Sequence, residues 1–139
     1  MRGRIGPRRA RPARRAAVAL LALAACWAVS AQAGAYEDCV TAGNQNAVMS
    51  CLAAAEKQAN ADLSNAEAQV AQKARAVESA TGKPGIHAAL AKSVRDFAAY
   101  RASQCAYVRE MAVREPVAEQ AAAACRVDLT RTRLRELRP

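Results

Sequence analysis

The chain has 139 residues, and its 21 Lys and Arg against 12 Asp and Glu give a formal net charge of +9. This charge does not indicate a nucleic-acid partner, because seven of the basic residues fall within the first fifteen positions, where there is no acidic residue. The remainder carries 14 basic and 12 acidic residues, a net charge of +2. Its length suits one domain with a modest core.

Residues 1–33 have the layout of a secretory signal peptide. A basic segment precedes an apolar run over residues 16–29, which at fourteen residues is shorter than the roughly 20 of a membrane-spanning helix. Residues 31–33, Ala-Gln-Ala, form an A-x-A cleavage site. We therefore predict a signal peptide over residues 1–33 and a mature domain over residues 34–139, in the periplasm or outside the cell.

Cys26 leaves a second interpretation of this leader open. Residues 23–26, Leu-Ala-Ala-Cys, also match a lipobox, in which the cysteine becomes the lipidated first residue of a bacterial lipoprotein. Soluble export is preferred, because the apolar run continues past Cys26 and the A-x-A site follows it. The alternative is a lipid anchor in the envelope at Cys26, the one expected route to a membrane.

The other four cysteines are Cys39, Cys51, Cys105 and Cys125. An even set in an exported chain predicts two disulfides. Zinc is disfavoured, because the gaps of 11, 53 and 19 residues contain no C-x2-C pair and His87 is the only histidine of the sequence. We expect no metal and no other cofactor.

The alanine-rich composition, with few aromatic residues, favours closely packed helices over a sheet. Apolar residues recur at spacings of three and four over residues 46–80, 86–113 and 116–137, which predicts three amphipathic helices. The predicted fold is all-α: a small antiparallel three-helix bundle, made of a long helical hairpin and a C-terminal helix and braced by two disulfides.

Two breakers separate these helices. Residues 81–85, Thr-Gly-Lys-Pro-Gly, cannot continue a helix, and Pro116 suits only the first turn of one. A break in the first helix near residues 57–61 is left open, because Gln58 and Asn60 weaken its apolar pattern.

Helix register distinguishes the possible disulfides. Cys105 and Cys125 each lie ten residues from the turn near Glu115, at one level of an antiparallel pair, so they can bond. Across the first hairpin, Cys105 and Cys51 are offset by about 15 Å of helical rise, more than the Cα separation of about 7 Å that a disulfide allows. By elimination Cys39 pairs with Cys51. This connectivity is a geometric preference among the three that four cysteines permit.

No catalytic site is predicted. The cysteines are expected in disulfides, no G-x-S-x-G or phosphate-binding glycine loop occurs, and the carboxylates are scattered singly. His87 is interpreted as a solvent-facing histidine at the start of the second helix. We therefore expect a protein that is not an enzyme.

Phe97, Tyr100 and Arg101 are candidate structural residues of the second helix. Arg101 interrupts its apolar stripe between Phe97 and Cys105. The guanidinium either extends outward or pairs with an inward acid such as Asp62, which the hairpin count places nearly opposite. We expect a structural ion pair rather than a binding role.

The charge is divided along the mature chain, with −3 over residues 34–80 and +5 over residues 81–139. Either the two segments attract each other as solvated faces, or the acidic segment is free to meet a cationic partner. The C-terminal arginines are interpreted as a solvated helix end and not as a nucleic-acid site.

Short motifs accompany the cysteines: Cys39 with Gln45, Met49 and Cys51; Asp62-Leu63-Ser64; Phe97-Ala98-Ala99-Tyr100-Arg101 before Cys105; and Cys125 with Leu129, Thr130, Arg133, Glu136 and Leu137. This combination resembles the lysozyme inhibitor LprI-like N-terminal domain. The chain departs from the family pattern at Ser50 and Ser64, where asparagine is usual, and at Phe97, where tryptophan is usual. A tyrosine usual near Glu67 is also missing.

The resemblance implies a helical, disulfide-braced domain in the periplasm or at the cell surface, with lysozyme inhibition attributed to some members. Our leading hypothesis is an exported, non-enzymatic binding module that inhibits lysozyme by occluding the muramidase cleft. The alternative is a structural or adaptor protein of the bacterial envelope, anchored through Cys26.

Overall fold

The structure is a computed structural model that describes residues 34–138, so the expected signal peptide and Cys26 lie outside the described residues. The described part contains four α-helices and no strand: α1 Ala35–Val40, α2 Gln45–Thr81, α3 Ile86–Met111 and α4 Val117–Leu137. The predicted all-α helical bundle is confirmed. The short helix α1 is an addition to the three predicted helices.

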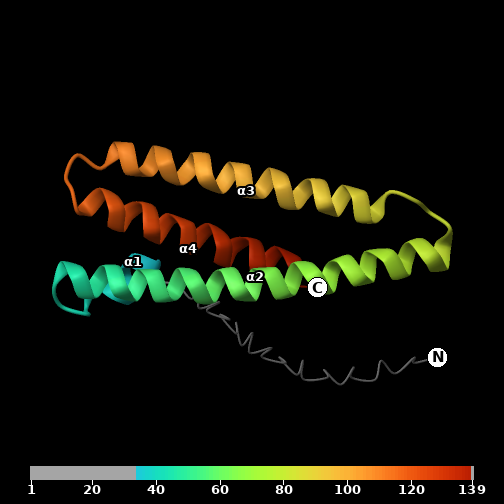
Figure 1. The fold of residues 1–139 in the computed structure, drawn as a ribbon, viewed down its shortest axis with the longest axis horizontal. Coiled ribbons are helices and arrows are strands. Elements are labelled where there is room, and N and C mark those ends of the chain that lie inside the picture. Colours follow the sequence, from blue (N-terminus) through green and yellow to red (C-terminus); the bar gives the residue numbers. More distant parts are fainter. Residues whose placement is uncertain (1–33, 139) are drawn as a thin grey trace, which may run out of the picture. The chain divides into compact units, whose positions relative to one another are not determined.

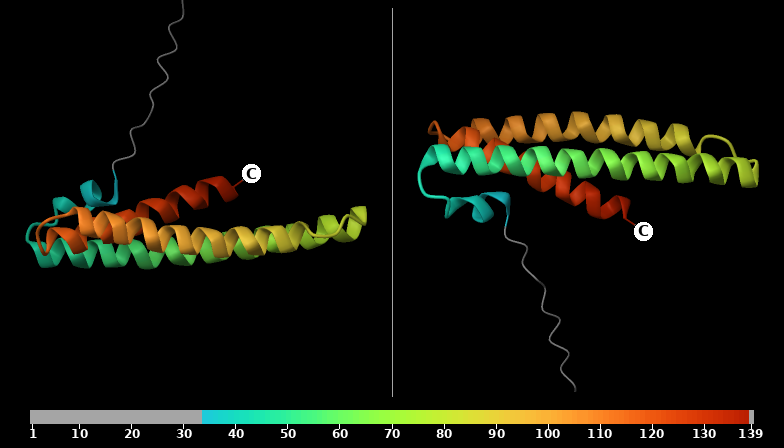
Figure 2. Two further views of the ribbon diagram at one scale, coloured as in Figure 1. Left: turned by 90° about the horizontal axis from the view of Figure 1, so that it is seen from above. Right: turned by 60° about the horizontal axis from the view of Figure 1, so that its bottom comes forward.

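The two longest helices form an antiparallel hairpin, and α4 returns along it from the end of α3 (Figure 1). Two further views show that α4 crosses the hairpin at an angle and ends well before the α2–α3 connection (Figure 2). Leu137, the last residue of α4, and Arg138, which follows it, share a surface hollow with Lys73 of α2. The last turns of α2 and the first turns of α3 therefore project beyond the end of α4.

Helix α2 runs without interruption through residues 57–61, so the break that the sequence left open does not occur. The reason is that Ala59 and Leu63 are buried and hold the helix against its neighbours, while Gln58 and Asn60 lie on exposed positions. At the start of α2 the Asn44 side chain accepts a hydrogen bond of 3.0 Å from the backbone N–H of Ala47.

The main core lies at the α1 end of the bundle, where α1, the first turns of α2 and the middle of α4 meet. Leu52 and Val127 are fully buried there, and each contributes about 1.5–3 kcal/mol by leaving water. Buried alanines of α4 let its backbone approach α2 closely. The core cluster consists of Ala35, Cys39, Val48, Leu52, Ala123, Ala124 and Val127.

Two disulfides brace this end of the fold. Cys39–Cys51 ties α1 to α2 with a Cα separation of 5.7 Å, and Cys105–Cys125 ties α3 to α4 with a Cα separation of 5.6 Å. These are the pairs that the helix register favours. Neither disulfide joins α2 directly to α3, so the hairpin is held by its own connection over residues 82–85 and by the packing of its two helices.

Candidate functional site

Phe97 and Arg101, two of the three predicted structural residues, lie in a cluster where α2, α3 and α4 meet. The guanidinium groups of Arg101 and Arg133 both lie over the Phe97 ring, each 5.7 Å from its centroid. Arg133 donates a hydrogen bond of 2.7 Å to Ser93 Oγ, so a residue of α4 is tied to α3. Both guanidinium groups therefore lie within cation–π distance of the same ring.

The expected ion pair between Arg101 and Asp62 is wrong. Arg101 Nη1 instead donates to Asn60 Oδ1 at 2.8 Å and to Thr130 Oγ1 at 2.7 Å. Asp62 accepts a hydrogen bond of 2.9 Å from Gln58 on its own helix. The hairpin count considered only two helices, whereas α4 supplies a buried hydroxyl that attracts the guanidinium. A structural role for Arg101 nevertheless fits these contacts.

Tyr100 does not take part in this cluster, because its side chain is exposed: the residue retains 52% of its accessible surface. Glu67 is the carboxylate that the cluster influences electrostatically. Burial raises the pKa of Glu67, and the positive charges of Arg133 and Arg101 counteract this shift only in part.

The acidic side chains of residues 34–80 are partly neutralised by α4. Glu56 accepts two hydrogen bonds from Arg126, at 2.7 and 3.0 Å, and these bonds raise the pKa of that arginine. Asp38 of α1 lies 2.8 Å from Arg131. The opposite charges of residues 34–80 and 81–139 thus pair within the molecule. This favours mutual attraction of the two segments over an acidic face that is free to meet a cationic partner.

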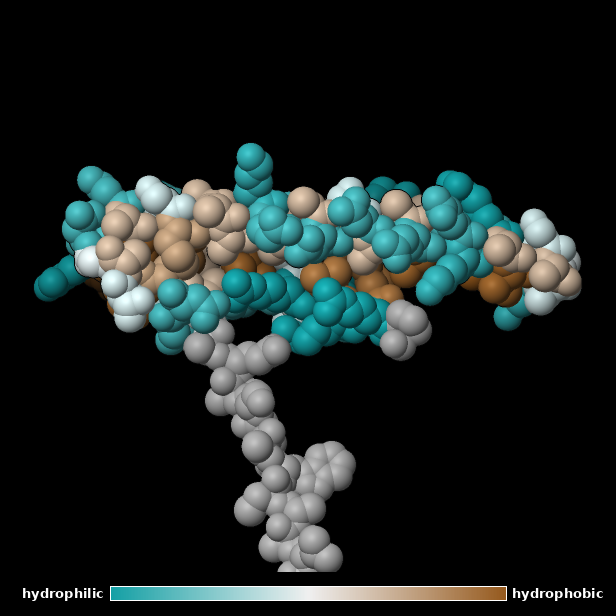
Figure 3. Space-filling model, turned by 90° about the horizontal axis from the view of Figure 1, so that it is seen from below, coloured by the Kyte–Doolittle hydropathy of each residue, from teal (hydrophilic) through white to brown (hydrophobic). Residues whose placement is uncertain are grey.

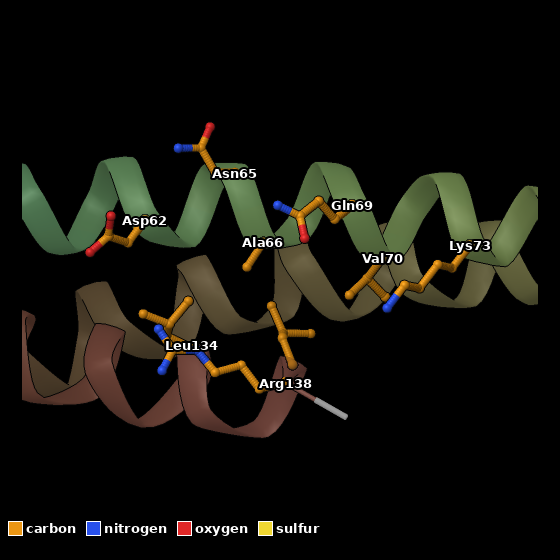
Figure 4. Close-up of a pocket in the computed structure, with 9 residues that line it drawn as sticks. Asp62, Asn65, Ala66, Gln69, Val70, Lys73, Leu134 and Arg138 are labelled. Atoms are coloured by element: carbon orange, nitrogen blue, oxygen red, sulfur yellow. The ribbon is translucent and has the colours of Figure 1, made fainter.

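The hollow between α2 and the end of α4 is a candidate small-molecule pocket, drawn in Figure 4. Its volume of about 270 Å³ is below the roughly 300–1,000 Å³ of typical ligand pockets. Polar and apolar side chains both line it. Its lining residues are Asp62, Asn65, Ala66, Gln69, Val70, Lys73, Leu134, Leu137 and Arg138.

A second groove, of about 390 Å³, lies between α2 and α3 and includes both Glu67 and His87. They do not form an acid–base pair. His87 is half-buried, and its Nε2 lies 3.0 Å from the guanidinium of Arg75. Arg75 is eight residues, or about 12 Å of helical rise, further along α2 than Glu67. Because a guanidinium only donates, Nε2 is the acceptor of this hydrogen bond. His87 thus has a structural contact and is not merely solvent-facing.

Exposed apolar side chains gather at the α3–α4 turn, and we name this group the turn patch. The exposed fractions are 58% for Tyr107, 63% for Met111, 97% for Val113 and 47% for Val117. Tyrosine and methionine are enriched in protein interfaces. The sequence signal was present, since Tyr107 and Met111 lie four residues apart and off the apolar stripe, but it was missed.

The opposite end of the hairpin is a second exposed feature. We name residues 74–92, which lie beyond the end of α4, the hairpin tip. It carries the bases Arg75, Lys83 and Lys92 against the single acid Glu78. Seen from below, hydrophobic residues are exposed beside α4 and again toward this end of the hairpin (Figure 3).

The described residues contain no group of three His, Cys, Asp or Glu side chains placed to hold a metal ion. None of the helices over residues 34–138 is both long and apolar enough to span a bilayer. The geometry therefore defines a small, all-α, disulfide-braced domain whose most prominent surfaces are the two ends of a helical bundle.

The family model of lysozyme inhibitor LprI matches residues 35–137, which is the whole of α1 to α4, and the chain belongs to this family. No curated protein and no solved structure shows a significant match. Membership supports an inhibitor-type binding module, implies a protein partner, and assigns the chain to a generally non-catalytic family. Two disulfides agree with a location outside the cytoplasm.

Proposed function

We propose that this protein is exported, inhibits lysozyme by occluding the muramidase cleft, and performs no chemistry of its own. The observation that carries the proposal is the family match over residues 35–137, because it spans every helix of the fold and not one motif. Residues 34–139 form the mature domain in this proposal, and residues 1–33 are its signal peptide.

Steric occlusion fits the surface of the molecule. A stable protein complex buries about 800 Å² on each partner. Helix α2 has 37 residues and is therefore about 55 Å long, and α3 lies beside it, so the hairpin offers an interface of this size. A folded domain that covers part of a glycosidase cleft excludes the polysaccharide without any catalytic group.

The test is a titration of the oxidised protein, produced by export of the full chain, against cell-wall lysis by several lysozymes. We expect lysis to fall as the protein approaches a molar excess, with direct binding seen by calorimetry. The matched control is the same protein reduced and alkylated, which lacks both disulfides. Full lysis at large molar excess with every lysozyme tested would remove the inhibitor proposal.

The turn patch favours a second candidate function, that of an envelope adaptor. Tyr107 and Met111 are exposed at the end of the bundle opposite to the hairpin tip, where a further protein can bind. In this alternative Cys26 is lipidated and anchors the chain. Membrane fractionation with and without globomycin tests the anchor, and a soluble product that is insensitive to globomycin rejects it.

A further inference from the structure

The α2–α3 loop is the most exposed connection at the hairpin tip. Helix α2 continues for eight residues beyond Lys73, about 12 Å of helical rise, before the loop begins. All five residues 81–85 are exposed. A Cβ placed on Gly82 or Gly85 meets no atom within 4 Å, so there is open space beside both glycines.

This loop is also held in one conformation. Gly82 closes α2 in the left-handed region with φ 66°, and its N–H bonds to the carbonyl of Glu78 at 2.9 Å. Thr81 Oγ1 donates to the Val77 carbonyl at 2.7 Å and accepts from the N–H of Lys83 at 3.3 Å. A loop fixed before binding loses little conformational entropy when it enters a partner.

A hydrogen bond across the hairpin supports the same loop from its far side. The Glu78 carboxylate accepts from the backbone N–H of His87 at 2.9 Å, which joins the end of α2 to the start of α3. The contact between Arg75 and His87 lies one turn below it. The loop is therefore supported by both helices.

Lys83 lies at the apex of this loop, and the charge of its ammonium group is not paired with any residue that the structure describes. Arg75 is engaged by His87, and Lys92 is paired with Asp96 at 2.5 Å. Among the described residues of the hairpin tip, Lys83 is the cation whose ammonium has no side-chain partner. With glycine on either side of the pair Lys83–Pro84, its side chain is free to extend ahead of the loop.

A muramidase cleft has chemistry complementary to this cation. Glycoside hydrolysis uses two carboxyl groups that flank the scissile bond, and at least one of them is ionised at neutral pH. An ammonium group is a compact charge with three donors, which suits a carboxylate in a cleft otherwise lined for sugars.

We propose that the α2–α3 loop is the segment that enters the muramidase cleft, and that Lys83 Nζ pairs there with an ionised catalytic carboxylate. This inference rests on the proposed function and deepens it by naming the inhibitory segment. The turn patch at the other end of the bundle stays free in such a complex.

Charge reversal at the apex tests the proposal. Lys83→Glu is compared with Lys57→Glu, which makes the same change in net charge at an exposed position of α2 outside the hairpin tip. We expect Lys83→Glu to raise the concentration for half-inhibition of lysis by roughly tenfold or more, Lys57→Glu to leave it unchanged, and Lys83→Arg to retain most of the inhibition. Circular dichroism and the thermal midpoint verify that the variants are folded.

Competition gives an independent readout. We expect an oligosaccharide of N-acetylglucosamine that occupies the lysozyme cleft to displace the protein in calorimetry. Three results would overturn the loop proposal while inhibition by the parent stands. They are equal inhibition by Lys83→Glu and the parent, equal loss of inhibition in Lys83→Glu and Lys57→Glu, and binding that the oligosaccharide does not affect. Absence of inhibition by the parent overturns the proposed function and the loop assignment together.

Discussion

Removal of the Cys105–Cys125 disulfide by a double substitution to alanine is expected to cost about 3 kcal/mol of the free energy of unfolding. The bond closes a loop with a sequence separation of 20 residues, and the loss of loop-closure entropy in the unfolded chain gives this magnitude. Such a cost is large beside the 5–15 kcal/mol that a typical domain has in total. Helix α4 carries Ala123, Ala124 and Val127 of the main core, so its release affects the whole fold.

Urea denaturation followed by circular dichroism measures this cost. With a slope of about 1–3 kcal/mol per molar urea, the midpoint is expected to fall by about 1–3 M. The matched control is the double alanine variant of Cys39 and Cys51, whose separation of 12 residues makes the entropic cost only about 0.5 kcal/mol smaller. A loss below about 1 kcal/mol for the Cys105 and Cys125 variant would refute the view that restriction of the unfolded chain stabilises this small-core domain.

Three further changes test the packing of the helices. Thr130→Val removes the buried acceptor of Arg101 and is expected to lower the free energy of unfolding by about 2 kcal/mol in urea titrations, whereas exposed Thr132→Val costs less than about 0.5 kcal/mol. Because burial raises the pKa of Glu67, its ionised form is unfavourable in the folded state at neutral pH; Glu67→Gln should raise the thermal midpoint at pH 7, and this gain should vanish below the ordinary glutamate pKa of about 4.3. A thermal midpoint that Glu67→Gln leaves unchanged at pH 7 would contradict the raised pKa of Glu67. Gly82→Ala places a Cβ on a residue with φ 66° and should cost about 1 kcal/mol by the same urea measurement, and a neutral result would mean that the left-handed turn is not required.

Much of this fold follows from local properties of the sequence. Spacings of three and four residues predict the three long helices, and residues 81–85 and Pro116 separate them in the structure as expected. The disulfide pairs also follow from the sequence, because a rise of about 1.5 Å per helical residue sets Cys105 level with Cys125 and away from Cys51, which leaves Cys39 for Cys51. Helix α1 could not be predicted in this way, because its six residues are too few to show a periodic apolar pattern.

What stabilises α1 is long-range. Its first N–H donates to Asp128 of α4 at 2.9 Å, and its Cys39 is bonded to Cys51 of α2. Such contacts depend on where the helices come together, which no local pattern specifies.

The sequence by itself determined the class of the protein, the axial register of its helices and, through the cysteine framework and its motifs, the family. Tertiary structure alone decided the partners of the charged residues: Arg101 with Asn60 and Thr130, and Arg126 with Glu56. It also decided the angle at which α4 crosses the hairpin (Figure 2). The physical reason is that helical rise is a local property of the backbone, whereas the angle at which α4 crosses the hairpin results from the packing of all the helices.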